Sequence, residues 1–236
     1  MSMAAATQQT VAELADYLVE RMKERASSSD RRVIVAVSGT PGSGKSHLSE
    51  LVSAAVNTRV DGAPVATVLP MDGFHLTKAQ LASMDDPALA MLRRGAPWTF
   101  DSQAFVELVR RVRGSSSSSS ANGEATVWAP SFDHAVGDPV PGAIAIEPHH
   151  RVVIIEGLYA HVSDEPWAQL ESLVDERWWV EPRCKTQSRE RLVQRHLRAG
   201  LAADRAAAEN RIDGNDGLNG EYAAARRLTP TRIVLN

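Results

Sequence analysis

Apolar positions near the beginning of the chain recur at the interval of an α-helix. Thr10 and Glu13 have the spacing of a capping box, in which two residues satisfy the free amides at a helix start. The apolar positions around and after them fall on one helical face: Val11, Leu14, Leu18 and Met22. The pattern predicts an amphipathic helix that opens the domain.

Short apolar runs follow, with the length and composition of buried strands. Residues 33–37 are apolar and mostly β-branched, as expected for a strand covered on both faces. Residues 46–56 have helical composition. Further strand-like runs lie at 65–69, 152–155, 178–180 and 233–235, the last as an edge or closing strand. This alternation of strands and helices predicts an α/β fold with a mainly parallel sheet.

Other segments carry weaker signals. Residues 73–97 are irregular, and stretches of this kind often host a substrate. Asp101 is predicted to cap a helix whose apolar face would use Phe105, Leu108, Val109 and Val112. Residues 187–200 are strongly helical and rich in arginine. A turn-rich stretch with interspersed glycines is predicted to be a surface loop: Asp213, Asn215, Asp216 and Asn219.

Composition indicates one globular unit. The 236 residues are 43% hydrophobic and 23% charged, which is enough apolar material for one substantial core. A pure serine tract at 115–120 runs into Ala121, Asn122 and Gly123, a composition typical of a flexible link. We therefore expect a single domain over 1–236, with a flexible surface insertion at about 114–124.

Charge, cysteine content and hydropathy exclude several classes of function. A net charge of −3 gives the chain no general attraction to nucleic-acid phosphates. Cys184 is the single cysteine and cannot form an internal disulfide, and no apolar run approaches the roughly 18 residues that span a membrane. The first residues lack the features of a secretory signal. We expect a soluble, cytoplasmic protein that binds neither nucleic acid nor membrane.

The segment GTPGSGKS at 39–46 satisfies the complete pattern G-x-x-x-x-G-K-[ST] of a P-loop, between a predicted strand and a predicted helix. Glycines let the backbone amides approach phosphate oxygens, Lys45 neutralises the β- and γ-phosphates, and the Ser46 hydroxyl ligates Mg²⁺. We therefore expect ATP and Mg²⁺ at this loop. The residues assigned to the nucleotide are Gly39, Thr40, Pro41, Gly42, Ser43, Gly44, Lys45, Ser46 and His47.

Two acidic residues follow predicted strands. Because the carboxyl ends of parallel strands meet at one edge of a sheet, Asp72 and Glu156 are expected near the loop. Asp72 could accept the proton of an acceptor hydroxyl, and Glu156 could hold Mg²⁺ or one of its waters. Each could instead be a turn or helix-cap carboxylate, but the complete P-loop favours the catalytic interpretation.

The segments GTPGSGKS, PMDGFHL, RRGAPWTFD, PSFDH, VVIIEGLY and ERLVQRHLRAG together resemble the phosphoribulokinase/uridine kinase family of P-loop kinases, over about 33–200. Within that family they are most similar to a nucleoside or nucleotide kinase-like branch of bacteria and fungi, with pantothenate kinase a relative. The resemblance implies a three-layer sandwich with a five-stranded, mainly parallel core sheet and a helical lid at about 187–205. It matches Asp72 to the catalytic aspartate and Glu156 to the Walker B acid.

The resemblance also implies which segments surround the phosphoryl acceptor. The residues in them are Phe74, His75, Arg94, Phe100, Asp101, Phe132, Asp133 and His134. His75 stands where uridine kinases commonly have tyrosine, and PSFDHAVGDP follows their nucleoside-binding pattern only loosely. Nucleoside, pantothenate-like and sugar acceptors therefore all stay open. Trp98 lies inside one of these segments and is otherwise a packing residue.

Three arginines of the predicted lid helix, Arg191, Arg195 and Arg198, are spaced i, i+4 and i+7 and share one face. A charged face is commonly just solvated. The resemblance implies instead a lid that closes over the phosphates, and it makes Arg195 and Arg198 the better candidates for stabilising transferred charge.

The sequence thus predicts an ATP- and Mg²⁺-dependent kinase that phosphorylates a hydroxyl of a small molecule. The catalytic residues would be Asp72, Lys45, Arg195 and Arg198, and the metal ligands Ser46 and Glu156. An NTPase switch, or a nucleotide-binding protein without kinase activity, is the alternative, although the guanine-specificity motif N-K-x-D is absent. The oligomeric state stays open, a homo-oligomer included.

Overall fold

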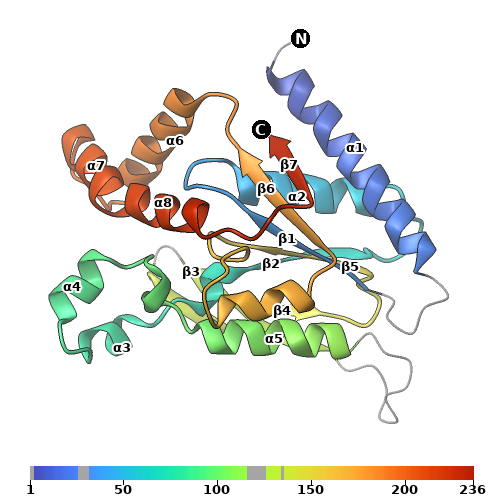
Figure 1. Cartoon of the computed structure of the whole chain (residues 1–236), viewed down its shortest axis with the longest axis horizontal. Helices are drawn as coiled ribbons and strands as arrows, with labels where there is room; N and C mark the ends of the chain where they lie inside the picture. The colour runs from blue at the N-terminus through green and yellow to red at the C-terminus, as the bar shows by residue number, and fades with distance from the viewer. Residues whose placement is uncertain (1–2, 26–31, 116–125, 134–135) are drawn as a thin grey trace.

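The computed structural model describes residues 3–25, 32–115, 126–133 and 136–236 (Figure 1). Within these ranges it describes side chains from residue 10 onward, except at residue 133. Its centre is a five-stranded sheet with the strand order β2-β5-β1-β6-β7, in which every neighbouring pair is parallel. The strands are β1 (Val33–Ser38), β2 (Ala66–Pro70), β5 (Val152–Glu156), β6 (Glu176–Glu181) and β7 (Arg232–Leu235). The predicted parallel core sheet is confirmed.

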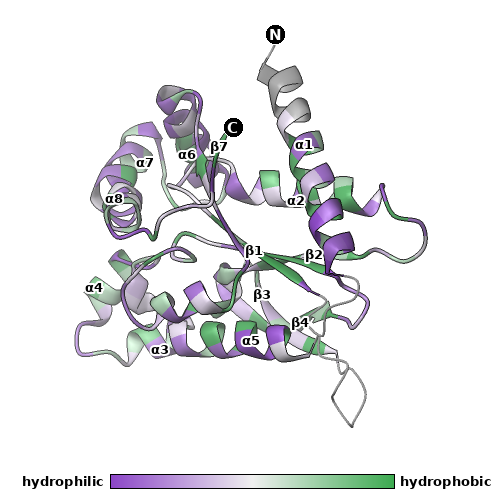
Figure 2. Cartoon of the chain, turned by 45° about the vertical axis from the view of Figure 1, so that its right-hand side comes forward, coloured by the Kyte–Doolittle hydropathy of each residue, from purple (hydrophilic) through white to green (hydrophobic). Residues whose placement is uncertain are grey.

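Helices cover both faces of this sheet and make the three predicted layers. Side chains alternate along β1: Val33, Val35 and Val37 face the helices α1 (Met3–Glu24) and α2 (Lys45–Asn57). Ile34 and Ala36 face the other layer. That layer contains α5 (Ser102–Gly114) and the 3₁₀ helix Trp167–Ser172. Figure 2 shows the apolar strands β1 and β2 between helices with many hydrophilic residues.

A second, two-stranded sheet lies beside the core. The antiparallel strands β3 (Val127–Asp133) and β4 (Asp138–Ile146) pack on α5 and on the 3₁₀ turn Met71–Phe74 that follows β2. The sequence analysis did not predict this hairpin. Three prolines interrupt its alternating pattern, and proline normally argues against a strand: Pro130, Pro139 and Pro141.

The irregular segment 73–97 contains two short helices, α3 (Lys78–Ala82) and α4 (Pro87–Leu92). Thr77 and Gln80 form a capping box at α3, and the Asp86 carboxylate caps α4 by accepting from the Leu89 amide. Each helix is shorter than two turns, so neither leaves a visible period in the sequence. Asp101 caps α5 as predicted, by accepting from the Ala104 amide at 2.9 Å.

The C-terminal third adds three helices that lie together above α3 and α4 in Figure 1: α6 (Lys185–Arg198), α7 (Arg205–Arg211) and α8 (Gly217–Ala225). A π-helical turn, Ile212–Asp216, joins α7 to α8. The predicted surface loop over Asp213–Asn219 is therefore wrong. Asn215 and Asn219 are buried, and tertiary hydrogen bonds outweigh the turn preference of this composition.

Two other expectations differ at their boundaries. The opening helix begins at Met3, so Thr10 lies inside it and the predicted capping-box start is wrong. Most of the predicted insertion, residues 116–124, lies outside the described residues. Among the helices that are described, none combines the length and hydropathy needed to cross a membrane.

Candidate active site

The P-loop joins β1 to α2, as its pattern requires. The Ser43 amide donates to the Thr40 carbonyl at 3.0 Å and closes a tight turn. Gly42 and Gly44 have φ angles of 78° and 88°, in the left-handed region where a side chain would be strained. The first turn of α2 follows at Lys45. A glycine loop ending at a helix N-terminus presents backbone amides to an anion.

Glu156 lies at the end of β5, next to the P-loop. It is buried, and its Oε1 accepts a hydrogen bond from the Ser46 hydroxyl at 3.2 Å. Its second oxygen, Oε2, is buried and has no partner within the described residues. Burial raises the pKa of Glu156, the Lys45 ammonium opposes this rise, and the Asp72 charge adds to it. The site thus holds an incompletely satisfied carboxylate beside a cation.

These two oxygen groups fit Mg²⁺. A carboxylate and a hydroxyl are hard oxygen ligands, and the unpartnered Oε2 of Glu156 is available to one more partner. Across the described ranges, no group of three or more His, Cys, Asp or Glu side chains could hold a metal ion by itself. That is expected for Mg²⁺, which commonly takes one or two protein ligands and completes its shell with phosphates and water.

Asp72 reaches the same edge from the neighbouring strand. Pro70, Glu156 and Val37 lie at one level of the sheet, because the β2–β5 and β1–β5 registers align them. Asp72 follows two residues later, and its side chain is 45% exposed. A Cβ at Gly157 would lie 2.4 Å from the Cβ of Met71. The two acid-bearing segments therefore approach this closely only because residue 157 is a glycine.

His75 stands beside Asp72 in an aromatic stack. Its Nε2 is 4.0 Å from Oδ1 of Asp72. The imidazole stacks on Phe100 with centroids 4.0 Å apart, and Phe132 of β3 lies 4.9 Å away on a tilted plane. Three of the predicted acceptor residues are thus brought together next to the predicted base. Phe74, in contrast, turns into the core and packs edge-on against Phe105 at 5.1 Å.

Arg94 braces the wall of this site. Its guanidinium donates to the Leu76 carbonyl at 2.8 Å and to the Gly137 carbonyl, and it pairs with Asp138 at 3.3 Å. These bonds tie the β3–β4 turn to the segment after β2. Asp101 uses its carboxylate as the cap of α5. The backbone of Asp133 lies opposite that of Asp138 in the hairpin register, and its side chain and His134 lie outside the described part of the chain. Contact of any of these with an acceptor stays a prediction.

The arginines of α6 occupy different environments. Arg191 donates to the carbonyl oxygen of Gly42 in the P-loop, at 2.8 and 3.3 Å. Arg195 is 56% exposed and lies 3.8 Å from Asp216, and Arg198 donates to the Gln194 carbonyl of its own helix. The sequence analysis preferred the last two. Arg191 lies nearer the helix N-terminus, which is the end that adjoins the loop, and that position is the signal the analysis missed.

Sequence reasoning also missed residues that link the C-terminal helices to the acceptor wall. Arg93 donates to Asn215 at 3.0 Å and to Asn219 at 3.1 Å, and Asn215 donates to the Arg94 carbonyl at 2.9 Å. The Tyr159 hydroxyl donates to the Gly95 carbonyl at 2.6 Å. These contacts connect residues far apart in the chain, so no local pattern announced them.

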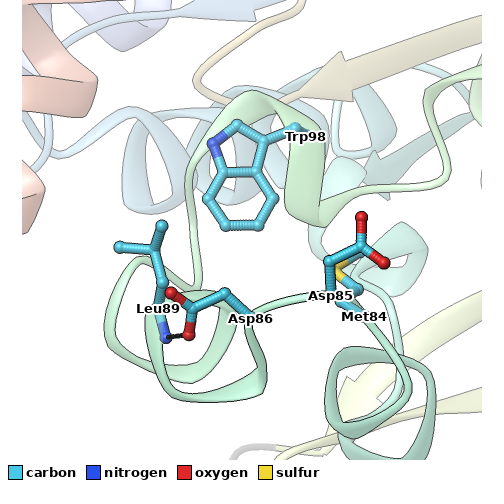
Figure 3. A pocket seen from close by; sticks show the side chains of 5 residues that line it. All are labelled: Met84, Asp85, Asp86, Leu89 and Trp98. Atoms are coloured by element: carbon cyan, nitrogen blue, oxygen red, sulfur yellow. Dashed lines mark hydrogen bonds between the residues drawn. The ribbon is translucent and has the colours of Figure 1, made fainter.

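Two cavities flank this region. One, of about 430 Å³, is lined by Met84, Asp85, Asp86, Leu89 and Trp98, and none of the predicted site residues lines it (Figure 3). Trp98 points into this cavity, on the side of α3 and α4, and is 47% exposed. The other, of about 420 Å³, adjoins the P-loop at Thr40 and Pro41. Its walls combine apolar Leu192 and Ile212 with the basic residues Lys185, Arg189 and Arg227 and the acidic residue Glu181.

Known proteins resemble this chain along most of its length, although no protein-family profile matches it. An "ATP-dependent kinase-like protein" of Aspergillus versicolor is 48% identical over 164 residues, covering 70% of this chain and 92% of that one. A "putative uridine kinase" of Schizosaccharomyces pombe is 37% identical and covers 94% of this chain and 88% of its own. The crystal structure of a "putative fructose transport system kinase" from Silicibacter sp. TM1040 is 35% identical, with a TM-score of 0.77 and coverage of 94% and 98%.

Proposed function

The chain belongs to the P-loop kinases of the uridine kinase and fructose transport kinase group, and we propose that it transfers the γ-phosphoryl group of ATP, with Mg²⁺, to a hydroxyl of a nucleoside-like or other small metabolite. The observation that carries this proposal is the convergence of Ser46, Glu156 and Asp72 at one edge of the sheet. The relatives' names support ATP as the donor and leave the acceptor open, since one names uridine and another a fructose transport system.

Each group at this edge has a separate task. The P-loop amides and the Lys45 ammonium hold the phosphates and stabilise the charge that moves to the leaving ADP oxygen. The Ser46 hydroxyl and the Glu156 carboxylate, which lie 3.2 Å apart, would hold Mg²⁺. When bound, Mg²⁺ neutralises the charge shared by the β- and γ-phosphates.

Asp72 acts on the acceptor. As the acceptor oxygen bonds to the γ-phosphorus, the bond from that phosphorus to the ADP oxygen breaks, and the hydroxyl proton passes to the Asp72 carboxylate. The partial exposure of Asp72 allows an acceptor to reach it. The stack of His75, Phe100 and Phe132 offers an aromatic wall beside this carboxylate, which fits an acceptor with a flat or apolar face.

An acceptor panel tests the proposal. ADP release would be followed by a coupled assay with nucleosides, pantothenate and sugars as acceptors, and we expect one class to raise turnover well above background hydrolysis. If ATP binds and no acceptor raises turnover, the chain is an NTPase switch or a nucleotide-binding protein instead. Arg195 and Arg198 remain candidates for closing over the phosphates, which acceptor-dependent rates of their alanine variants would reveal.

Asp72→Asn tests the base directly. We expect this variant to keep its ATP affinity and to lose transfer by on the order of 10²-fold or more, because the amide cannot take the proton. Asp61→Asn is the matched control, since Asp61 is exposed in a loop. Equal turnover in the Asp72 and Asp61 variants would remove Asp72 from the mechanism.

A further inference from the structure

Asn236, which directly follows β7, reaches the P-loop from a distant part of the chain. Its side-chain Nδ2 donates to the Ser43 carbonyl at 3.0 Å, across 193 positions of sequence. We propose that Asn236 is a positioning residue for the nucleotide phosphates: it fixes the Ser43–Gly44 peptide so that the Gly44 amide faces the bound anion. The inference rests on the proposed nucleotide binding and adds a residue that no motif contains.

The backbone of Asn236 is itself held on both sides. Its amide donates to the Glu181 carbonyl at 2.9 Å, and its carbonyl accepts from the Arg183 amide at 2.8 Å. These bonds continue the parallel pairing of β7 with β6, in which Leu235 lies opposite Glu181. The side chain therefore projects from a fixed point at the edge of the sheet. Because its backbone is anchored, the Asn236 amide can fix the orientation of the Ser43 carbonyl. A donor on a mobile segment would adjust to the carbonyl instead.

The direction of the Gly44 amide follows from the geometry of the peptide bond. In a trans peptide the carbonyl and the N–H point in opposite directions, so a Ser43 carbonyl held toward Asn236 turns the Gly44 N–H away from it. Within the described residues this N–H donates to no protein acceptor, which leaves it to a ligand. A Cβ at Gly44 would lie 2.2 Å from Nδ2 of Asn236, so the close contact needs glycine on one side and the amide on the other.

The preceding peptide shows why this contact is different. Arg191 holds the Gly42 carbonyl, but the N–H of that same peptide, on Ser43, already donates to Thr40. Arg191 therefore braces a closed turn. Asn236 holds the Ser43–Gly44 peptide, the one of this pair whose amide is still available. Removal of the Asn236 side chain should therefore weaken the binding of any ligand with phosphate oxygens.

Binding of three ligands tests the assignment: ATP, GTP and inorganic tripolyphosphate, measured by calorimetry on the full chain. We expect Asn236→Ala to weaken the binding of all three ligands by a similar factor, roughly tenfold. This is the effect of losing one hydrogen bond that orients the anion-binding loop. Asn236→Asp keeps the shape, loses the donor and adds a negative charge, so it should weaken binding further. In the kinase assay, the alanine variant should raise KM for ATP more than it lowers kcat.

Leu235→Ala is the control, because Leu235 immediately precedes Asn236 at the end of β7 and has an exposed side chain. This variant should bind all three ligands as the wild type does. Loss of ATP affinity with unchanged tripolyphosphate affinity would show that Asn236 contacts the base, and would overturn the inference. Wild-type affinities in both Asn236 variants would overturn it as well. A wild-type chain that binds neither ATP nor tripolyphosphate would instead refute the proposed function on which the inference rests.

Discussion

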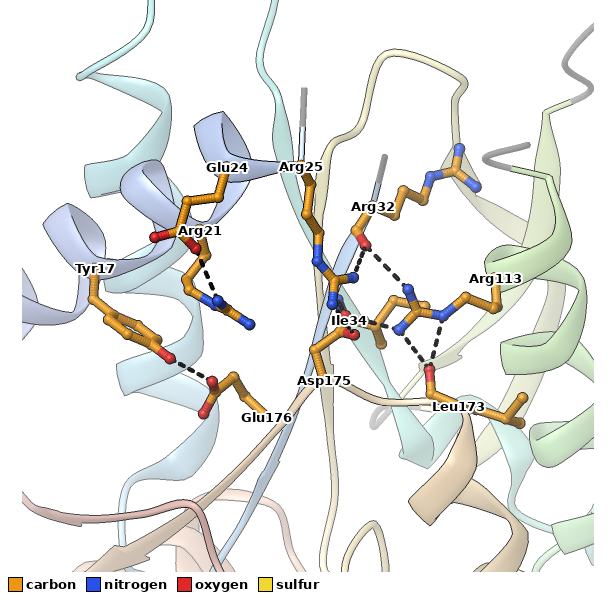
Figure 4. A network of polar contacts seen from close by, with 10 residues as sticks. All are labelled: Tyr17, Arg21, Glu24, Arg25, Arg32, Ile34, Arg113, Leu173, Asp175 and Glu176. Atoms are coloured by element: carbon orange, nitrogen blue, oxygen red, sulfur yellow. Dashed lines mark hydrogen bonds and ion pairs between the residues drawn. The ribbon is translucent and has the colours of Figure 1, made fainter. Parts of the chain in front are cut away.

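The carboxyl and amino ends of the central sheet differ in how their buried charged side chains are paired. At the carboxyl end, Glu156 is buried, one of its oxygens has no partner in the described part of the chain, and Asp72 is partly exposed beside it. At the amino end, Asp175 accepts from the Ile34 amide and pairs with Arg25 and Arg113, each at 2.7 Å (Figure 4). Both ends bury charge, but among the residues that the structure describes only the amino end supplies it with complete pairing.

Arg32 at the amino end makes the contrast clearer. It is almost fully buried, and its guanidinium donates to three backbone carbonyls: Val112 at 2.7 Å, Glu147 at 2.8 Å and His150 at 2.9 Å. A buried charge whose three nitrogens all donate stabilises one arrangement of the chain. A buried charge with an unused acceptor costs stability until a ligand supplies the partner. The difference separates a structural network from a binding site.

Glu156→Gln should produce the largest effect on activity. The amide keeps the shape and can still accept from Ser46, but it removes the negative charge that the proposed Mg²⁺ site requires, so we expect phosphoryl transfer to fall by about 10²- to 10³-fold. Rates would be measured at saturating ATP over a series of Mg²⁺ concentrations. Folding should be unimpaired, since the raised pKa of Glu156 shows that its charge is unfavourable in the folded state. A wild-type rate of phosphoryl transfer in this variant would show that Glu156 has no functional role, and would contradict the contrast between the two ends.

Asp175→Asn is the matched change at the amino end. It leaves two guanidinium groups without their carboxylate, and we expect the free energy of unfolding to fall by about 3 kcal/mol. Urea unfolding would measure this loss. The rate of phosphoryl transfer per folded molecule should stay unchanged, because Asp175 lies at the amino end of the sheet and the P-loop lies at the carboxyl end. A variant with normal stability and impaired kcat would reverse the roles assigned to the two ends.

His161 sharpens the comparison with a smaller, pH-dependent effect. Its Nε2 lies 2.8 Å from the Ala36 carbonyl, its Nδ1 has no partner within the described residues, and burial lowers its pKa to about 4. A lowered histidine pKa means that its share of stability is present above about pH 6.5 and is lost as pH falls toward 4. In His161→Gln we expect unfolding free energy to depend less on pH, by up to about 2 kcal/mol at pH 5.

Urea unfolding at pH 7 and pH 5 would test this expectation, with His149→Gln as the control. The His149 side chain is 41% exposed, so its replacement should have little effect on the free energy of unfolding. If wild type and His161→Gln lose stability equally between the two pH values, the imidazole is protonated in the folded state and the buried, half-satisfied arrangement is wrong.

The sequence predicted those features that depend on local order. Each predicted strand of the core exists, and the loop at 39–46 and the acids Asp72 and Glu156 follow strands that the sheet aligns. Contacts between distant segments were not predictable. Nothing near Asn236 indicates Ser43, and the hairpin of β3 and β4 is stabilised by packing on α5 despite its prolines. Arg191 was visible as a charge, but only the placement of α6 showed that it meets the loop.

Gly157, the glycine after Glu156, sets how closely the segment that carries Asp72 can approach the end of β5. An alanine at position 157 would place its Cβ 2.4 Å from the Cβ of Met71, the residue before Asp72, so we expect it to displace Asp72 more than the Lys45 and Ser46 side chains. One added carbon atom would then impair phosphoryl transfer while nucleotide binding is retained. The absence of a side chain at position 157 is thus a requirement of the proposed transfer chemistry, as much as the two carboxylates are.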